Sequence, residues 1–325
     1  MRAIIPVAGV GSRLRPHTYT LPKVLLTVAG KPILGHIIDK VQAEGIHEAT
    51  IVIGHMRDKI VDYLTEAYPD FQFDLVEQEE RKGLGHAMYL SRNTFGSEPI
   101  LIILGDTIFD VDLGPVLSGK ESAIGVKEVD DPRRFGVAVL ENQYIKKLVE
   151  KPEHLVSRMA VVGIYFIRNT GLLVDCLTEL VSKDIRTKGE YQLTDALQLM
   201  IDRGEKMRTF TVDGWYDCGK PETLLETNRA LLSRNSRARD LKGVVINDPV
   251  YISSTAVLSN CVVGPYASVG DHAEITESVV RNCIISQGAR VSRVLLDNSI
   301  IGNDSVVTGS FKRLNVGGAS EIETD

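Results

Sequence analysis

The chain has 325 residues, of which 43% are hydrophobic and 25% charged, and its formal net charge at pH 7 is −6. These proportions are typical of a soluble globular protein of about two domains, and they exclude a disordered, fibrous or low-complexity chain. The acidic balance argues against binding to nucleic acid or to a membrane surface through bulk charge. No apolar run approaches the roughly 20 residues of a membrane helix, no secretory signal is recognisable, and the four cysteines form no CxxC pair. We therefore expect a cytoplasmic protein with reduced thiols.

Up to about residue 232, compact apolar runs alternate with stretches of helical spacing. Strands are predicted at 3–7, 50–53 and 100–104, and helices at 33–44 and 59–67. Further strands are expected at 122–129, 136–140 and 161–167, and further helices at 172–181, 193–203 and 221–232. This alternation predicts an α/β fold with a doubly wound, mixed but mostly parallel sheet. Ligands of such sheets bind beyond the carboxyl ends of the strands, where Gly9–Gly11 and Gly105–Asp106 are expected.

After a polar connector at 233–240, the helical spacing stops and a short phrase recurs. It reads NCVVG from Asn260, NCIIS from Asn282 and NSIIG from Asn298. The first two copies are 22 residues apart and the last two 16, which differ by one six-residue step. Aliphatic residues recur at that step directly: Val257, Val263, Val269 and Ile275. The repeats favour a short parallel β-helix, with a small β-sandwich as the alternative. We expect domains at 1–235 and 236–325.

The strongest local motif is GVGSRLRP, which directly follows the first predicted strand. It is neither a dinucleotide-binding GxGxxG nor a Walker A loop. Gly9 and Gly11 allow backbone amides to approach an anion closely, and Arg13 adds a planar donor suited to phosphate. Lys23 follows ten residues after Arg13. From the residues alone, phosphate binding and an ordinary strand-to-helix turn with surface charges both stay open.

The segment GVGSRLRPHTYTLPKVLLTVAGKPIL resembles the signature of the sugar-1-phosphate nucleotidyltransferases, also called nucleotide-sugar pyrophosphorylases. The blocks ILGDTIF, FGVAVL, KLVEKP, AVVGIYF, KGEYQLTDA and GWYDCGKPETLLETN follow in the order of that family. The C-terminal repeats, ending in KRLNVGGASEI, resemble the left-handed β-helix of the long-form glucose-1-phosphate thymidylyltransferases. One departure is Val24, where the family usually has proline or glutamine. The resemblance implies a Rossmann-like nucleotidyltransferase fold followed by a short left-handed parallel β-helix.

The same resemblance implies a Mg²⁺-dependent reaction of dTTP or UTP with a sugar 1-phosphate, most simply glucose 1-phosphate, to give an NDP-sugar and pyrophosphate. Three cations would be catalytic: Arg13 on the triphosphate, Lys23 on the α-phosphate, and Lys151 on the phosphate of the sugar. Asp106 and Asp217 would hold Mg²⁺, which prefers oxygen ligands. Without the resemblance, the two aspartates are better interpreted as solvated loop carboxylates, and Lys151 as a surface lysine before a turn proline.

The resemblance also implies two sets of binding residues. Those for the nucleotide are Ala8, Gly9, Gly11, Ser12, Gln78 and Gly83. Those for the sugar phosphate are Gly136, Glu150, Lys151, Lys188, Glu190, Thr194 and Trp215. The Gln78 amide offers both a donor and an acceptor, which suits the mixed edge of uracil or thymine. Lys188 stands where short-form thymidylyltransferases carry arginine, and for Trp215 a role in the core stays open.

Two alternatives accompany this interpretation. The chain would be a catalytically inactive, nucleotide- or sugar-binding regulatory homologue if it had kept the fold and lost the chemistry. Arg13, Lys23, Asp106, Lys151 and Asp217 are all present, however, which favours an enzyme. Some relatives carry an acyltransferase in their C-terminal coils, but the repeats here span only about 80 residues and a single histidine lies beyond residue 154. We expect these coils to serve homo-oligomer assembly or an effector site.

Overall fold

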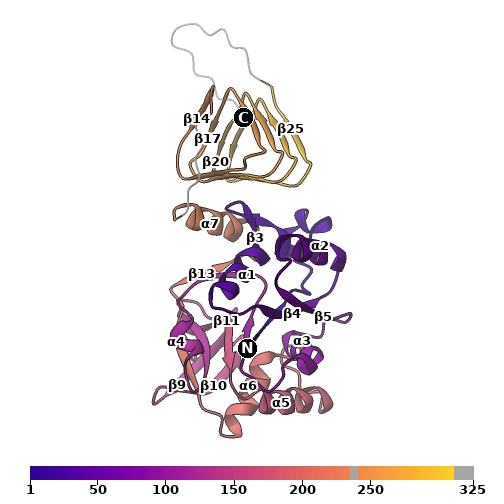
Figure 1. Ribbon diagram of the computed structural model, residues 1–325. Coiled ribbons are helices and arrows are strands. Elements are labelled where there is room, and N and C mark those ends of the chain that lie inside the picture. Colours follow the sequence, from indigo (N-terminus) through magenta and orange to yellow (C-terminus); the bar gives the residue numbers. More distant parts are fainter. Residues whose placement is uncertain (235–240, 311–325) are drawn as a thin grey trace. The chain divides into compact units, whose positions relative to one another are not determined.

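The computed structural model describes residues 1–234 and 241–310 and divides into two compact units (Figure 1). The first unit comprises Met1–Thr27 and Lys31–Thr227, and the second comprises Val28–Gly30 and the described residues from Asn228 onward. The contacts thus divide the chain after Thr227, and a domain boundary at residue 235 stays a prediction. Most of the predicted connector and the KRLNVGGASEI segment lie outside the described residues. None of the described helices is long and apolar enough to cross a membrane.

The first unit is built on one nine-stranded sheet. In spatial order its strands are β5 (Gln72–Glu77), β4 (Glu48–Ile53), β1 (Arg2–Pro6), β6 (Ile100–Ile103), β11 (Met159–Ile167), β8 (Ser122–Glu128), β12 (Met207–Thr211), β10 (Tyr144–Glu150) and β9 (Gly136–Glu141). Strands β5, β4, β1 and β6 are mutually parallel, as is β8 with β12, whereas the other pairings are antiparallel. The predicted sheet is therefore confirmed as mixed, but its parallel character is confined mainly to one half. Two-stranded sheets join β13 (Gly214–Asp217) to β7 (Thr107–Asp110), and β2 (Thr27–Val28) to β3 (Lys31–Pro32).

All the predicted helices are present. The α-helices are α1 (Ile33–Ala43), α2 (Arg57–Ala67), α3 (Leu84–Ser91), α4 (Gly114–Leu117), α5 (Thr170–Ser182), α6 (Leu193–Asp202) and α7 (Pro221–Leu232). Short 3-10 helices occupy Ser12–Leu14, His17–Tyr19, Lys23–Leu25 and Arg92–Thr94. In α1 the residues spaced for one face, Ile33, Ile37 and Val41, are all buried, as the periodicity predicts.

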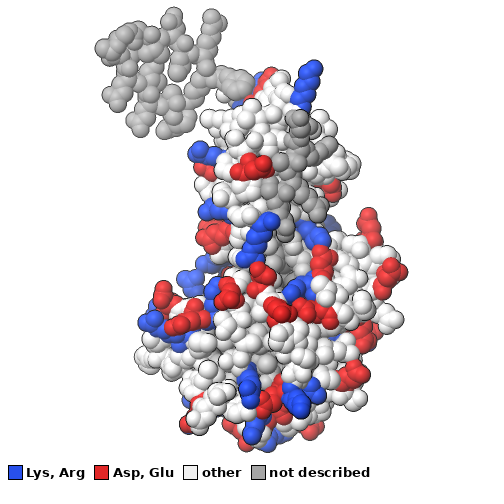
Figure 2. Space-filling view, turned by 60° about the vertical axis from the view of Figure 1, so that its left-hand side comes forward, with Lys and Arg blue, Asp and Glu red and all other residues white. Residues whose placement is uncertain are grey.

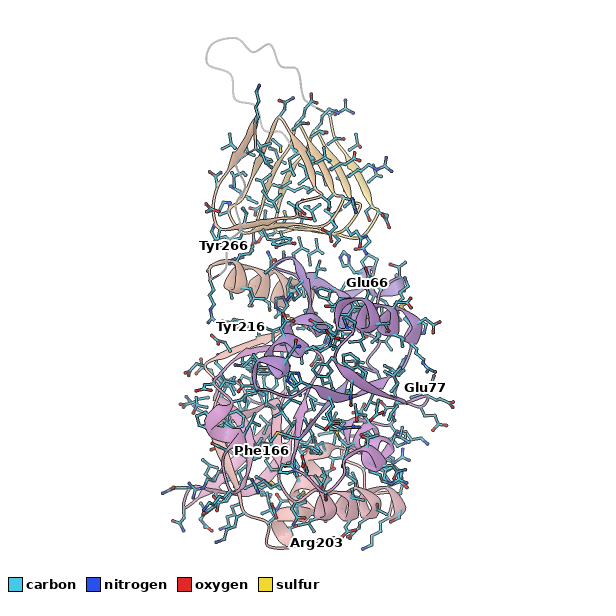
Figure 3. The ribbon with its side chains drawn as sticks, viewed as in Figure 1. Glu66, Glu77, Phe166, Arg203, Tyr216 and Tyr266 are labelled. Atoms are coloured by element: carbon cyan, nitrogen blue, oxygen red, sulfur yellow. The ribbon has the colours of Figure 1, made fainter. Side chains whose placement is uncertain are left out.

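The core of the first unit lies between the sheet and a layer of helices. Helices α3, α5 and α6 pack on one another, and their apolar faces share one buried cluster with strands from the centre of the sheet. Phe166 of β11 is fully buried inside this unit (Figure 3). Strand β5 and helix α3 were not predicted, because the QFDLVE strand is only partly buried at the sheet edge and the LGHAMYLS helix has a weak apolar face.

The second unit consists of three four-stranded parallel sheets, and every coil of the chain adds one strand to each (Figure 1). The first sheet contains β14 (Val244–Ile246), β17 (Cys261–Val263), β20 (Val279–Arg281) and β23 (Leu295–Asp297). The second contains β15 (Val250–Ile252), β18 (Ala267–Val269), β21 (Ile284–Ile285) and β24 (Ile300–Ile301). The third contains β16 (Val257–Ser259), β19 (Glu274–Thr276), β22 (Arg290–Ser292) and β25 (Val306–Thr308). Parallel stacking of this kind fits a β-helix and not a β-sandwich, whose sheets are antiparallel.

The recurring asparagines occupy the corners of the coils. Asn260, Asn282 and Asn298 have φ angles of 49°, 47° and 49°, in the left-handed region that asparagine tolerates better than most residues. Asn260 precedes β17 of the first sheet, whereas the other two precede strands of the second sheet. Because the first copy precedes a strand of a different sheet, its distance from the second copy is longer by one six-residue step. The Asn282 side-chain amide also donates a hydrogen bond to Asn298 Oδ1 on the next coil.

The six-residue periodicity is wrong at one position. Val263, Val269 and Ile275 are buried in the core of the coils, but Val257 is 60% exposed. Strand β16 pairs Leu258 with Ile275, so Leu258 takes the inward position and Val257 faces solvent. The register is shifted by one residue because the step from Leu258 to Val263 is five residues, whereas the steps from Val263 to Val269 and from Val269 to Ile275 are six.

A short piece of the N-terminal signature belongs to the second unit. The backbone N–H of Ala29 donates to Asn228 Oδ1 at 2.8 Å, and Ser268 Oγ donates to the same oxygen at 2.6 Å. The Asn228 amide donates in turn to the backbone oxygen of Tyr266 (labelled in Figure 3) at 3.2 Å. Asn228 is fully buried, so its side chain fixes the Val28–Gly30 segment against the coils.

The corner conformation gives a test of the repeat. Replacing Asn282 by alanine removes its side-chain bonds and leaves a Cβ-bearing residue without local hydrogen bonds at positive φ, whereas glycine removes the bonds alone. We expect Asn282→Ala to unfold at lower temperature than Asn282→Gly, by a free-energy difference of about 1 kcal/mol. Thermal unfolding of the two variants beside the wild type measures this difference. Equal stability of the two variants would contradict a left-handed backbone at this corner.

Candidate active site

Two adjoining cavities lie at the strand ends of the first unit. The Gly11 cavity, of about 570 Å³, is lined by the glycine-rich loop and by residues 78–87. The Glu150 cavity, of about 350 Å³, is lined by the ends of β9 and β10, the middle of β11, the start of α6, and β13. Both cavities are lined by Arg13, Leu84, Leu104 and Asp106. The structure therefore offers two neighbouring binding spaces that meet at a guanidinium and a carboxylate.

The glycine-rich loop forms a wall of the Gly11 cavity. Gly11 has a φ of 65°, and a Cβ there would lie 2.8 Å from Lys23 Cβ, so both its backbone conformation and the space around it require glycine. Thr18 Oγ1 donates to the Gly11 carbonyl at 2.9 Å and holds the turn. A Cβ on Gly9 would meet nothing within 4 Å, so that side of the loop is open. All six residues predicted for the nucleotide line this cavity: Ala8, Gly9, Gly11, Ser12, Gln78 and Gly83.

Lys23 and Asp106 form an ion pair beneath the cavities. Lys23 begins a 3-10 helix and is 7% exposed, and its Nζ lies 2.8 Å from Asp106 Oδ2. Asp106 follows β6, where a Cβ on Gly105 would clash with Val7 Cγ1 at 2.5 Å. The close approach of the Gly105 turn to β1 thus places the Asp106 carboxylate beside the lysine that follows the glycine-rich loop.

Asp217 reaches the same place from β13. In the β7–β13 pairing Asp217 lies opposite Thr107, the neighbour of Asp106. Burial of the carboxyl raises the pKa of Asp217, and the nearby Asp106 charge adds to this, against the lowering effects of Lys23 and Arg13. A Cβ on Gly219 would lie 2.8 Å from Asp217 Oδ1 and 3.0 Å from an Arg13 terminal nitrogen. Two carboxylates that the sequence separates by 111 residues are therefore brought together.

Gln78 is held in one orientation within the Gly11 cavity. It is 5% exposed, and its Nε2 donates to the Gly83 carbonyl at 3.1 Å and lies 3.2 Å from His86 Nδ1. Burial, with the neighbouring Lys82 charge, lowers the pKa of His86, so the imidazole is neutral at pH 7 and its Nδ1 can accept this bond. With the His86 proton on Nε2, both amide hydrogens of Gln78 are engaged by Gly83 and His86, and its carbonyl oxygen has no hydrogen-bond partner among the described residues.

The Glu150 cavity gathers carboxylate and hydroxyl groups around a glycine. Thr194 Oγ1 donates to Glu150 Oε2 at 3.0 Å, and Lys151 Nζ lies 3.3 Å from Glu150 Oε1. A Cβ on Gly136 would lie 3.0 Å from Thr194 Cγ2 and 3.1 Å from Glu150 Oε2, so glycine leaves that carboxylate accessible. Strand pairing sets Gly136 directly opposite Glu150.

Trp215 lines the Glu150 cavity and packs edge-on against Phe135, with ring centroids 4.9 Å apart. Its indole Nε1 is buried and has no hydrogen-bond partner among the described residues. Buried donors are rarely left unpaired in native proteins. The side chain is thus part of the cavity wall, and its N–H is a buried donor without a partner among the described residues.

Two of the residues predicted for the sugar phosphate lie elsewhere. Glu190 lines the Gly11 cavity. Lys188 lines neither cavity, and its Nζ donates to Glu153 Oε1 at 2.9 Å, with both side chains exposed. The other five, Gly136, Glu150, Lys151, Thr194 and Trp215, line the Glu150 cavity.

The structure also adds residues that sequence reasoning missed. Among them are four residues with long polar or charged side chains in the cavity walls: Arg81, Arg134, Gln192 and Lys220. Each lies within two residues of a recognised block or predicted site residue, which is the only signal in the sequence. On the face seen in Figure 2, acidic and basic side chains are interspersed. The cations of the cavities are therefore a local feature that the net charge of −6 does not reveal.

Gly83 offers a test of the Gly11 cavity. Its φ is 105°, and a Cβ would lie 2.5 Å from the Tyr191 carbonyl, so alanine would force the loop away from Tyr191. We expect Gly83→Ala to lose about 1–3 kcal/mol of unfolding free energy, together with the stabilisation given by added dTTP or UTP. Thermal unfolding with and without the nucleotide measures both effects. Gly204→Ala is the matched control, since Gly204 has a φ of 92° with open space around it. A nucleotide response kept in Gly83→Ala would contradict the placement of the nucleotide.

Comparisons with known proteins identify a family that covers the part of the chain with both cavities. A family model described as "Nucleotidyl transferase" matches residues 2–234. The chain is 35% identical over 314 residues to the bifunctional protein GlmU of Methanocaldococcus jannaschii, an alignment that covers 96% of this chain and 73% of that protein. It is 29% identical over 340 residues to a glucose-1-phosphate thymidylyltransferase of Streptomyces griseus, covering 95% and 94% of the two chains. Among solved structures, a UDP-glucose pyrophosphorylase complexed with UDP-glucose superposes with a TM-score of 0.63 at 28% identity, covering 72% of this chain and 99% of that one.

Proposed function

The chain belongs to the nucleotidyl transferase family, and on that premise we propose that it transfers a nucleotidyl group from dTTP or UTP to a sugar 1-phosphate, foremost glucose 1-phosphate. The products are an NDP-sugar and pyrophosphate. The observation that carries this proposal is the junction of the two cavities at Arg13 and Asp106. Each cavity can take one substrate, and the reacting phosphates then meet between them.

The nucleotide occupies the Gly11 cavity in this proposal. The loop amides and the Arg13 guanidinium bind the triphosphate, since a glycine-lined turn and a planar cation both suit phosphate oxygens. Lys23 lies beside the α-phosphate and offsets its charge. Lys23 is held by Asp106 rather than free to move, so little reorganisation is needed when the substrates bind.

The base lies against Gln78. Because both amide hydrogens of Gln78 are engaged by Gly83 and His86, its oxygen accepts the N3–H of uracil or thymine. Cytosine and adenine present an unprotonated ring nitrogen at the corresponding edge and would leave the Gln78 oxygen unpaired, which is costly in a buried site. Guanine also carries a ring N–H, and the preference for dTTP or UTP over GTP rests on the resemblance to thymidylyltransferases and uridylyltransferases.

The sugar 1-phosphate occupies the Glu150 cavity. Glu150 accepts hydrogen bonds from sugar hydroxyls, and Gly136 gives the ring access to that carboxylate. The Trp215 ring forms part of the same wall and packs against Phe135. Lys151 meets the phosphate as a compact charge, and Lys188 joins it only when its bond to Glu153 opens.

The residues at the junction fit a divalent cation. Asp106 and Asp217 are hard oxygen donors. Burial, followed by repulsion from Asp106, raises the pKa of Asp217, and a bound cation would relieve that repulsion. No cluster of three His, Cys, Asp or Glu side chains suited to a metal occurs in the described part of the chain. Mg²⁺ commonly uses one or two carboxylates, with substrate phosphates and water completing its coordination. When bound, Mg²⁺ neutralises phosphate charge and polarises the α-phosphorus.

The reaction is a direct displacement. An oxygen of the sugar phosphate forms a bond to the α-phosphorus, while the bond from that phosphorus to the bridging oxygen of the β-phosphate breaks, and pyrophosphate leaves with the electron pair. The protein contributes position and charge: Arg13 and Lys23 on the triphosphate and Lys151 on the attacking phosphate. No covalent enzyme intermediate is required.

Removal of one carboxylate tests the chemistry. We expect the wild type to release pyrophosphate from dTTP or UTP with glucose 1-phosphate, and Asp106→Asn to lose at least about 100-fold in kcat, since it weakens both the metal site and the support of Lys23. The control is Asp213→Asn, an exposed aspartate four residues before Asp217. Folded wild-type protein that binds nucleotide with Mg²⁺ but never turns over would instead indicate the inactive regulatory homologue.

The role of Gln78 predicts a pH dependence. Neutral His86 accepts from Gln78, and its pKa lies below the ordinary value, so this bond is kept at neutral pH and lost as the pH falls through that pKa. We expect the KM for dTTP or UTP to rise several-fold at pH values on the acid side of the ordinary histidine range, while the KM for the sugar phosphate changes little. His86→Asn keeps an acceptor that does not titrate and should remove the effect. An unchanged pH profile in His86→Asn would contradict this role.

The proposal also covers the handedness of the coils, the role of the coils and the compartment in which the protein works. The coils of the second unit are left-handed, as in the relatives that their sequence resembles. They mediate homo-oligomer assembly or bind an effector, which is supported by the exposed aliphatic side chains Val245 and Leu295 on one outer face. The protein works in a reducing compartment such as the cytoplasm, since its four cysteines are buried and unpaired.

A further inference from the structure

Two adjacent arginines precede β9, and their surroundings differ. Arg133 is paired with Asp131 through two parallel contacts, Nε to Oδ1 at 2.8 Å and Nη2 to Oδ2 at 2.9 Å. Arg134 makes no hydrogen bond or ion pair with any residue that the structure describes, and it lines the Glu150 cavity. Its charge makes only the smallest contribution to the lowered pKa of Asp131, after those of Arg133. The Arg133 guanidinium is thus paired with Asp131, whereas the Arg134 guanidinium lines a cavity and has no such partner among the described residues.

The backbone around Arg134 is fixed relative to the floor of that cavity. Gly136 pairs with Glu150 across β9 and β10, and the Lys151 N–H donates to the Phe135 carbonyl at 3.0 Å. The Phe135 ring is held by Trp215. Arg134 therefore directly precedes Phe135, the residue whose backbone is bonded to Lys151. Both cations lie at the same end of the sheet, Arg134 just before β9 and Lys151 just after β10.

The charges around the Glu150 cavity indicate that a further cation is required to bind a phosphate there. A phosphate monoester carries about −1.5 to −2 charges near pH 7, and the cavity wall already contains the carboxylates of Glu150, Asp106 and Asp217. The charge of Lys151 is shared with Glu150, and Lys188 is paired with Glu153 outside the lining. Lys220 also lines the cavity, but it belongs to the turn that carries Asp217. Among the described residues, Arg134 is the cation on the Glu150 and Lys151 side of the cavity that has no hydrogen-bond or ion-pair partner.

We propose that Arg134 binds the phosphate of the sugar 1-phosphate substrate and, with Lys151, fixes the attacking oxygen toward the α-phosphorus. This inference rests on the proposed function and adds a specificity-determining residue to it. A guanidinium can donate two parallel hydrogen bonds to phosphate, which orients the group as well as attracting it. A ring hydroxyl would offer the same side chain no comparable bidentate geometry.

The test compares the two neighbouring arginines. We expect Arg134→Ala to raise the KM for glucose 1-phosphate about tenfold or more, the loss typical of a hydrogen bond to a charged group. The KM for dTTP or UTP should change less than about twofold. Arg134→Lys should recover part of the loss, because it restores the charge but not the fork. Arg133→Ala is the matched control and should behave as the wild type, since exposed ion pairs contribute little.

Measuring the effect of Arg134→Ala on the KM of several sugar 1-phosphates distinguishes a contact to the phosphate from a contact to the sugar ring. If Arg134 binds phosphate, the Arg134→Ala loss has the same factor for every sugar 1-phosphate that the wild type accepts. A loss that varies with the configuration of the ring hydroxyls would overturn the assignment. It would also be overturned by an unchanged KM for glucose 1-phosphate or by an equal rise for the nucleotide.

Failure of the proposed function is distinguishable from failure of this inference. If the wild type releases no pyrophosphate with any substrate pair, the proposed function fails, and equilibrium binding of glucose 1-phosphate to wild type and Arg134→Ala then decides. Binding weakened about tenfold in the variant would support the phosphate contact. Equal binding, or none by the wild type, would overturn it.

Discussion

The ion pair of Lys23 and Asp106 is the constraint on which the arrangement of the site depends. It joins the segment after the glycine-rich loop to the turn after β6, with Nζ and Oδ2 2.8 Å apart and the lysine almost fully buried. A buried lysine needs a partner, because an unpaired charge away from water is costly. Glycines at positions 11 and 105 permit the approach, since a Cβ at either would clash with its neighbour. The two cavities share the carboxylate that results.

Around this pair the protein balances charges of both signs within a chain of net charge −6. The carboxylates of Asp106 and Asp217 repel each other, and Arg13 and Lys23 offset part of that repulsion. In the proposed reaction, ligands that bring both phosphate and a divalent cation would complete this balance of charges. On the other side of the junction, Glu150 is hydrogen-bonded by Thr194 and paired with Lys151, while Arg134 has no hydrogen-bond or ion-pair partner among the described residues. The proposal therefore assigns the nucleotide to one side of the junction and the sugar phosphate to the other.

Much of the fold and of the candidate site was predictable from the sequence, and the exceptions have physical reasons. Helix α1 has a strong helical periodicity, the buried strands are compact apolar runs, and the glycine-rich block identifies the loop. Strand β5 and helix α3 lack such patterns. The pairing of Lys188 with Glu153 and the freedom of Arg134 depend on which loops meet in space, which no local pattern encodes. Likewise, Val257 faces outward because the step between Leu258 and Val263 is five residues and not six, and the packing of Val28–Gly30 with Asn228 joins segments about 200 residues apart.

In the proposed reaction, a single direct displacement takes place at the α-phosphorus and is promoted by position and charge. The most direct measurement is the stereochemical course of the reaction with a chiral α-thio analogue of dTTP or UTP and glucose 1-phosphate. One in-line displacement predicts inversion of configuration at phosphorus, with NDP-sugar and pyrophosphate formed in equal amounts. Retention would reveal two displacements through a covalent intermediate and would contradict the account, as would the absence of any transfer to the sugar phosphate.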